Sequence, residues 1–157
     1  MYILSQRDPR WSDSLLGSSY LTMGEYGCTT TAISMLSDHV KAWMRPDIIG
    51  SHKSWYTDKN HPQGAGLILW DRLNIPGLKF ERRLFGYNYG AIKGSLKMPN
   101  KAVLLQVRGT HWVLGLGYDL LGNIRIADPW YGDKSTIKRY GGIDGITGSA
   151  HFKLYLQ

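Results

Sequence analysis

The sequence predicts an α+β fold in one domain spanning residues 1–157. Segments typical of helices dominate the first half of the chain, and short strand-like segments bounded by turns fill the second half. Helices that precede a run of strands, instead of alternating with them, argue against a doubly wound parallel sheet. A chain of 157 residues suits one domain and can bury a sizeable core without a disulfide or metal staple.

The first half is expected to begin with an ordered arm, residues 1–27, that is rich in turn-forming residues. Helical spacing of apolar residues predicts a helix over residues 28–38. Its apolar face consists of Cys28, Ala32, Met35 and Leu36. Residues 40–64 are expected to form a short helix and then an irregular loop. A second helix is predicted for residues 65–74, ending before Pro76.

The second half is expected to form an antiparallel meander. Residues 78–84 alternate as a strand, and residues 88–97 suggest a short helix. The remaining predicted strands are residues 102–107, 112–118, 123–128 and 151–156.

The chain is basic, with 19 Lys and Arg against 12 Asp and Glu and a formal net charge of +7. This charge favours acidic partners such as nucleic acid, anionic wall polymers or an anionic membrane surface, but a basic protein without such a partner remains an equal alternative. No basic stripe interleaved with aromatic residues is present, which argues against specific nucleic-acid binding. The oligomeric state is left open.

Localisation is constrained only by what the sequence lacks. Residues 1–10 do not resemble a secretory signal, and no apolar run is long enough to span a bilayer. We therefore expect a protein made in soluble form, with its localisation left open and the cytoplasm or a virion as the candidates; action outside the cell would need another factor to release or carry it. A single cysteine excludes an intrachain disulfide and a multi-thiolate zinc site. The other candidate ligands, His39, His52, His61 and His151, lack the paired spacing of a metal site, so no metal or cofactor is predicted.

Cys28 is the candidate nucleophile. It follows Gly27 at the predicted start of a helix, where unpaired backbone N–H groups and the helix dipole favour a thiolate. Gly27 is expected to leave the approach to the sulfur open. The alternative is that Cys28 is a small buried apolar residue, as free cysteines often are.

A predicted hairpin supplies a base and a residue to orient it. If the two strands pair across their connecting turn, Tyr118 faces Asn123 and Asp128 faces Val113. Side chains two apart along a strand share a face, so His111 and Asp128 become diagonal neighbours within reach of a hydrogen bond. A slip of one residue would place them on opposite faces.

Several motifs resemble, in order, those of the cysteine peptidases related to bacteriocin-processing (double-glycine) peptidases. The first group is Gln6-Arg7-Asp8-Pro9-Arg10-Trp11, Leu16-Gly17, Thr22-Met23 and Tyr26-Gly27-Cys28-Thr29-Thr30-Thr31-Ala32. The second group is Thr110-His111-Trp112-Val113-Leu114-Gly115, Gly117-Tyr118-Asp119 and Ile126-Ala127-Asp128-Pro129. The resemblance implies a papain-like fold with a Cys28–His111–Asp128 triad and an oxyanion-hole glutamine at Gln6. Thr29 departs from the glycine frequently found after the cysteine.

The resemblance and the residues together predict a cysteine peptidase or amidase that works by acyl transfer. Trp130 and Tyr131 are expected to form a wall of the substrate cleft, and Gly27 and Trp112 flank the nucleophile and the base. A bacterial or phage-borne factor that cleaves cell-wall peptides would suit a compact basic enzyme. The alternative is a binding module that keeps the peptidase fold without its activity. Thiol labelling separates the two, because an activated thiolate reacts quickly near neutral pH.

Overall fold

The chain forms an α+β structure built on one antiparallel sheet, which confirms the predicted fold class. A computed structural model describes residues 1–156. The helices are α1 (Met23–Tyr26), α2 (Cys28–His39), α3 (Pro46–Gly50) and α4 (Tyr89–Lys97). The strands are β1 (Leu78–Phe85), β2 (Lys101–Val107), β3 (His111–Tyr118), β4 (Ile124–Asp128), β5 (Asp133–Thr136) and β6 (Ile146–Leu154). Their order across the sheet is β1-β6-β2-β3-β4-β5.

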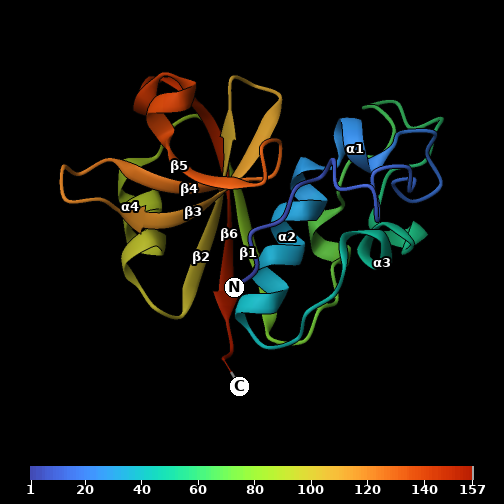
Figure 1. Ribbon diagram of the computed structural model, residues 1–157, viewed down its shortest axis with the longest axis horizontal. Helices are drawn as coiled ribbons and strands as arrows, with labels where there is room; N and C mark the ends of the chain where they lie inside the picture. The colour runs from blue at the N-terminus through green and yellow to red at the C-terminus, as the bar shows by residue number, and fades with distance from the viewer. Residues whose placement is uncertain (157) are drawn as a thin grey trace.

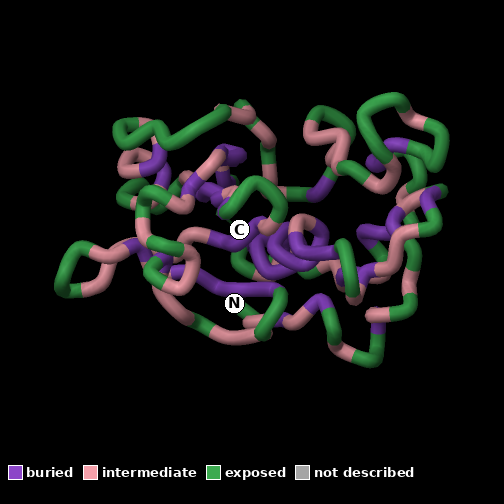
Figure 2. Tube along the Cα trace, turned by 90° about the horizontal axis from the view of Figure 1, so that it is seen from above, coloured by how far each residue is buried: buried purple, intermediate pink, exposed green. Residues whose placement is uncertain are grey.

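The helices α2 and α4 cover opposite faces of the sheet. Leu114 of β3 packs into a core that contains Ile33 of α2. Its neighbour Val113 packs into a second core that contains Ile92 of α4. This follows from the alternation of side chains along a strand. Figure 1 shows α4 with β2, β3 and β4 in one lobe and α1 and α3 in the other, and Figure 2 shows the buried turns of α2 at the centre.

The predicted helix over residues 28–38 is confirmed as α2 and begins at Cys28. Gly27 precedes it because a Cβ at this position would lie 2.5 Å from the carbonyl oxygen of Met23. Threonine is a poor helix former, but Thr30 is buried and its hydroxyl lies 2.6 Å from that of Tyr56. Burial and this hydrogen bond therefore fix the first turn of α2, which carries the candidate nucleophile.

The predicted helix over residues 65–74 is wrong, since only Trp70–Arg72 forms a short 3-10 turn, η2. Two local features keep the segment extended. Gly66 has a φ of +66°, which a helix does not allow. The hydroxyl of Thr57 donates to the carbonyl of Gly64 and accepts from the N–H of Leu67, so side-chain hydrogen bonds replace helical ones. The predicted short helix before this loop is present as α3.

The C-terminal strand differs from its prediction in length and position. It starts at Ile146 instead of residue 151 and lies between β1 and β2, so only β2 to β5 form a meander. Gly148 looks like a turn residue in the sequence, but here it leaves room for the guanidinium of Arg83 on β1. β5 was not predicted, because its polar sequence Asp133-Lys134-Ser135-Thr136 lacks the apolar alternation of a strand.

The hairpin of β3 and β4 contains a β-bulge at Leu116. Near the turn Tyr118 pairs with Ile124, one residue away from the predicted partner. Beyond the bulge Leu114 pairs with Ala127, which is the predicted register. One extra residue in β3 therefore restores the alignment that the turn had shifted.

Candidate active site

Cys28 is the first residue of α2 and lies at the junction of two cavities. Its side chain is 8% exposed, so it is shielded but open to small molecules. The hydroxyl of Thr29 is 4.0 Å from its sulfur. As the first helical residue, Cys28 also has a backbone N–H that finds no acceptor within the helix.

His111 lies between Cys28 and Asp128. Its Nε2 donates to Oδ1 of Asp128 over 2.8 Å, which leaves Nδ1 for the thiol. Burial acts to lower the pKa of His111, but the hydrogen bond to Asp128 and the electrostatic interaction with Cys28 outweigh it and raise the pKa to about 9. The imidazole is therefore oriented by Asp128 and keeps its proton near neutral pH.

Asp128 is fully buried at the end of β4. Besides His111, it accepts hydrogen bonds from the backbone N–H of Trp130, from Arg139 and from the hydroxyl of Tyr140. Burial acts to raise its pKa, but the hydrogen bonds prevail and lower the pKa to about 2. Asp128 is thus ionised at neutral pH and acts only as a hydrogen-bond acceptor toward the imidazole.

Arg139 and Tyr140 are the site residues that the sequence did not reveal. Both lie in the 3-10 helix η3 (Ile137–Tyr140), after β5. Arg139 also forms a two-pronged pair with Asp133, with both N···O distances at 2.8 Å. No local pattern links these residues to Asp128, because the contact arises only when η3 folds back over the end of β4.

Gln6 reaches the site from the N-terminal arm. Its backbone N–H donates to the carbonyl of Pro129, which ties the arm to the segment after β4. Its side chain is 1% exposed, and Nε2 donates to the carbonyl of Gly24. Within residues 1–156, Oε1 of Gln6 is buried without a hydrogen-bond partner. Gln6, Cys28 and His111 line the same cavity.

The two cavities adjoin at Cys28, which lines both together with Tyr26 and Thr110, and the pair is called the cleft below. One, of about 450 Å³, is lined by His111, Trp130, Tyr131 and Glu25 among others. The other, of about 540 Å³, is lined by Trp112 and by the loop that follows Tyr56. Neighbouring residues of a strand point in opposite directions, which is why His111 and Trp112 face different cavities.

Three of the four residues expected to contact substrate line one of the two cavities, and the fourth lines neither. Trp130 and Tyr131 line the cavity that holds His111, and Trp112 lines the other. Gly27 lines neither, and its missing side chain is required by the close approach of Met23 instead. Arg7 stacks on Trp130, with its guanidinium carbon 4.5 Å from the ring centre, and donates to the Trp130 carbonyl. This contact fixes one wall of the cleft.

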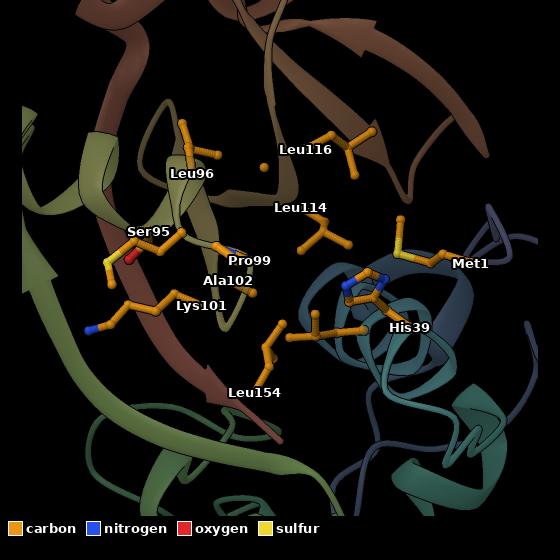
Figure 3. Close-up of a pocket in the computed structure, with 13 residues that line it drawn as sticks. Met1, His39, Ser95, Leu96, Pro99, Lys101, Ala102, Leu114, Leu116 and Leu154 are labelled. Carbon is orange, nitrogen blue, oxygen red and sulfur yellow. The ribbon is translucent and has the colours of Figure 1, made fainter. Parts of the chain in front are cut away.

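A separate, mostly apolar cavity of about 220 Å³ lies at the other end of α2 (Figure 3). It is lined by His39 from α2, by Leu96 and by Leu114 and Leu116 of β3. None of the candidate catalytic side chains reaches it.

No group of three or more His, Cys, Asp or Glu side chains within residues 1–156 is arranged to hold a metal ion. None of the helices described is long and apolar enough to cross a membrane.

The chain matches no protein-family model and no curated protein. The chemistry of the site therefore follows from its geometry. When a thiol and an imidazole line one cavity and a buried carboxylate orients the imidazole, the imidazole can take up and return a proton while the sulfur acts as a nucleophile.

Proposed function

We propose that this chain is a papain-like cysteine peptidase or amidase with Cys28 as its nucleophile. The observation that carries the proposal is the position of His111, which donates a hydrogen bond to the buried Asp128 and lines the same cavity as Cys28. A structural cysteine needs no imidazole held by a buried carboxylate. A nucleophile does, because the base must be fixed in one tautomer and orientation.

In this mechanism the sulfur of Cys28 attacks the carbonyl carbon of an amide while His111 holds the thiol proton. The oxyanion that forms is stabilised by the backbone N–H of Cys28 and by Nε2 of Gln6. His111 then gives its proton to the leaving nitrogen, the C–N bond breaks, and a thioester remains on Cys28. Water, deprotonated by His111, hydrolyses the thioester and frees the acid. Asp128 keeps the imidazole oriented throughout.

The size and charge of the molecule favour a short or flexible peptide as substrate. The two cavities that meet at Cys28 offer room for a few residues on each side of the scissile bond. The net charge of +7 favours encounters with anionic polymers. Peptides of a bacterial cell wall combine both properties, so a wall peptide is the substrate we favour over a folded protein.

Thiol labelling tests the proposal directly, because Cys28 is the only cysteine of the chain. We expect iodoacetamide to alkylate it rapidly near neutral pH and a mixture of unstructured peptides to be cleaved, as measured by mass spectrometry. Cys28→Ala should fold, because only a sulfur atom is lost from the packing, and should cleave nothing. Cleavage that survives in Cys28→Ala would overturn the proposal. An unreactive thiol without any cleavage would favour the binding module instead.

A further inference from the structure

Arg83 of β1 presents a fixed positive charge to the larger of the two cavities at Cys28. Its guanidinium carbon lies 4.2 Å from the ring centre of Phe85 and 4.9 Å from that of Trp112, and both rings line the same cavity. One of its nitrogens donates to Oε1 of Gln106 over 3.2 Å. Stacking and hydrogen bonding therefore hold the guanidinium in place before any ligand arrives.

This charge has no counter-ion among residues 1–156. No Asp or Glu of the described chain forms an ion pair with Arg83, and none lines the cavity. Burial lowers the pKa of Arg83 from its ordinary value, whereas carboxylate partners raise that of Arg139. The guanidinium stays charged, so a carboxylate that entered the cavity would be the first anion to pair with it.

The position of His111 shows which half of a substrate this cavity would take. In the proposed reaction His111 must give its proton to the leaving nitrogen. His111 lines the smaller cavity and is absent from the walls of the larger one. The leaving half of the substrate therefore belongs in the smaller cavity, and the acyl half belongs in the cavity that contains Arg83.

We propose that Arg83 selects substrates whose acyl half carries a carboxylate side chain, as a glutamyl or aspartyl residue does. This inference rests on the proposed peptidase function and adds the class of substrate. A planar guanidinium can bind a carboxylate through two parallel hydrogen bonds, and the buried ring of Trp112 on one side of it reduces competition from water. A neutral amide of the same shape lacks the negative charge and would bind more weakly.

Irreversible peptide labels test the selection without turnover. The probes are pairs of acetyl-tripeptide chloromethyl ketones. The two members of a pair differ at one position, which is Glu in one and Gln in the other, and there is one such pair for each of the three positions. The thiolate of Cys28 displaces chloride, and the rate of alkylation is measured by mass spectrometry. At one position the Glu label should react about tenfold faster than the Gln label, as a charged hydrogen bond in a partly exposed site allows.

Two variants of Arg83 and one of its neighbour complete the test. In Arg83→Met, which keeps an unbranched apolar chain to pack on Trp112, the ratio of the Glu to the Gln rate should fall to about one. In Arg83→Lys, which keeps the charge, an intermediate ratio is expected. Arg82→Gln removes the same charge from a residue that lines neither cavity, and the full ratio should persist.

The outcomes distinguish failure of the selection by Arg83 from failure of the peptidase proposal. A ratio near one at all three positions in the unmodified chain, or a ratio that Arg83→Met does not change, would overturn the selection by Arg83 while leaving Cys28 an active nucleophile. If no ketone labels Cys28, the peptidase proposal itself fails and the inference falls with it.

Discussion

Nε2 of His111 lies 2.8 Å from Oδ1 of Asp128 because β3 carries one extra residue between its pairs with β4. Near the turn the indices of paired residues sum to 242, as in Tyr118 with Ile124. That register, continued along the hairpin, would place Asp128 opposite Leu114 and on the other face from His111. The bulge at Leu116 changes the register by one residue and returns both side chains to one face.

Gly117 should therefore matter for catalysis as well as for folding. It follows Leu116 in the bulge and has a φ of +120°, a conformation that residues with side chains rarely adopt. No atom near Gly117 would obstruct a Cβ, so Gly117→Ala tests the backbone alone. The cost should be about 1–3 kcal/mol in the free energy of unfolding. Displacement of His111 from Asp128 should lower kcat/KM by about tenfold or more.

Gly122→Ala is the matched control for this prediction. Gly122 also has a positive φ and open surroundings, but it lies in the turn at the far end of the hairpin. Its substitution should cost a similar amount of stability and leave kcat/KM nearly unchanged. Equal kcat/KM losses in the two variants would show that the bulge does not position the site. Deletion of Leu116 should keep the sheet and abolish activity.

The sequence was sufficient to predict that His111 and Asp128 lie close together, but not that a β-bulge brings them together. Alternation along two strands places both residues on one face whenever Leu114 pairs with Ala127, and that pairing is present. The turn register and the bulge each depart from the simple hairpin by one residue, and the departures cancel. A bulge depends on backbone geometry at Gly117, which no side-chain pattern displays.

Contacts between distant segments could not be predicted from the sequence either, because they too depend on the folded backbone and not on a local side-chain pattern. The hydrogen bonds of Arg139 and Tyr140 with Asp128 join η3 to the end of β4, with the whole of β5 between them in the sequence. The extended segment around Gly66, which a helix had been expected to occupy, is held by the side chain of Thr57. Local spacing could place Cys28 at a helix start, because the pattern there repeats within four residues.

The raised pKa of His111 predicts a basic limit to activity. The thiolate of Cys28 needs a protonated imidazole beside it, and that proton is lost as the pH rises through about 9. We therefore expect kcat/KM to fall above about pH 9. Asp128→Asn removes the negative partner and should shift this limb to lower pH. Asp133→Asn, which removes the exposed partner of Arg139, should leave the limb in place.

The raised pKa of His111 also predicts how the free energy of unfolding depends on pH. His111 has a higher pKa in the folded chain than its ordinary value of 6.5, so the folded state binds more protons between pH 6.5 and about 9. The contribution of His111 to the free energy of unfolding should be complete below pH 6.5 and should disappear as the pH approaches 9. The free energies of unfolding of the unmodified chain and of His111→Ala, measured by denaturant titration at several pH values, should approach each other as the pH rises to about 9. A difference between the two that is the same at every pH would contradict the assignment.

Gln6 should act on the oxyanion and not on the thiol. Its Nε2 is fixed by the carbonyl of Gly24, and one N–H is left for a ligand in the cavity of Cys28 and His111. Gln6→Ala should lower kcat by roughly a hundredfold or more, as the loss of an oxyanion donor does elsewhere. Alkylation of Cys28 by iodoacetamide should remain nearly unchanged. An unaltered kcat would assign the oxyanion to another donor.

Cleavage of bacterial cell wall should depend on salt. A net charge of +7 raises the encounter rate with an anionic polymer, and that advantage weakens as the screening length falls from roughly 10 Å at 0.1 M salt to about 3 Å at 1 M. Purified peptidoglycan should release new amino termini, more slowly at high salt than at low, whereas cleavage of a short neutral peptide should respond little. Cys28→Ala should release none from either.

The two substrates separate a wall enzyme from a processing peptidase. Attraction to the polymer acts before the peptide enters the cleft, so its loss should lower kcat/KM on wall material and leave kcat unchanged. If isolated wall is untouched at every salt concentration while an unstructured peptide is cut, the wall proposal fails and a peptidase that processes flexible segments takes its place. The chemistry at Cys28 would then be the same, and only the origin of the peptide would differ.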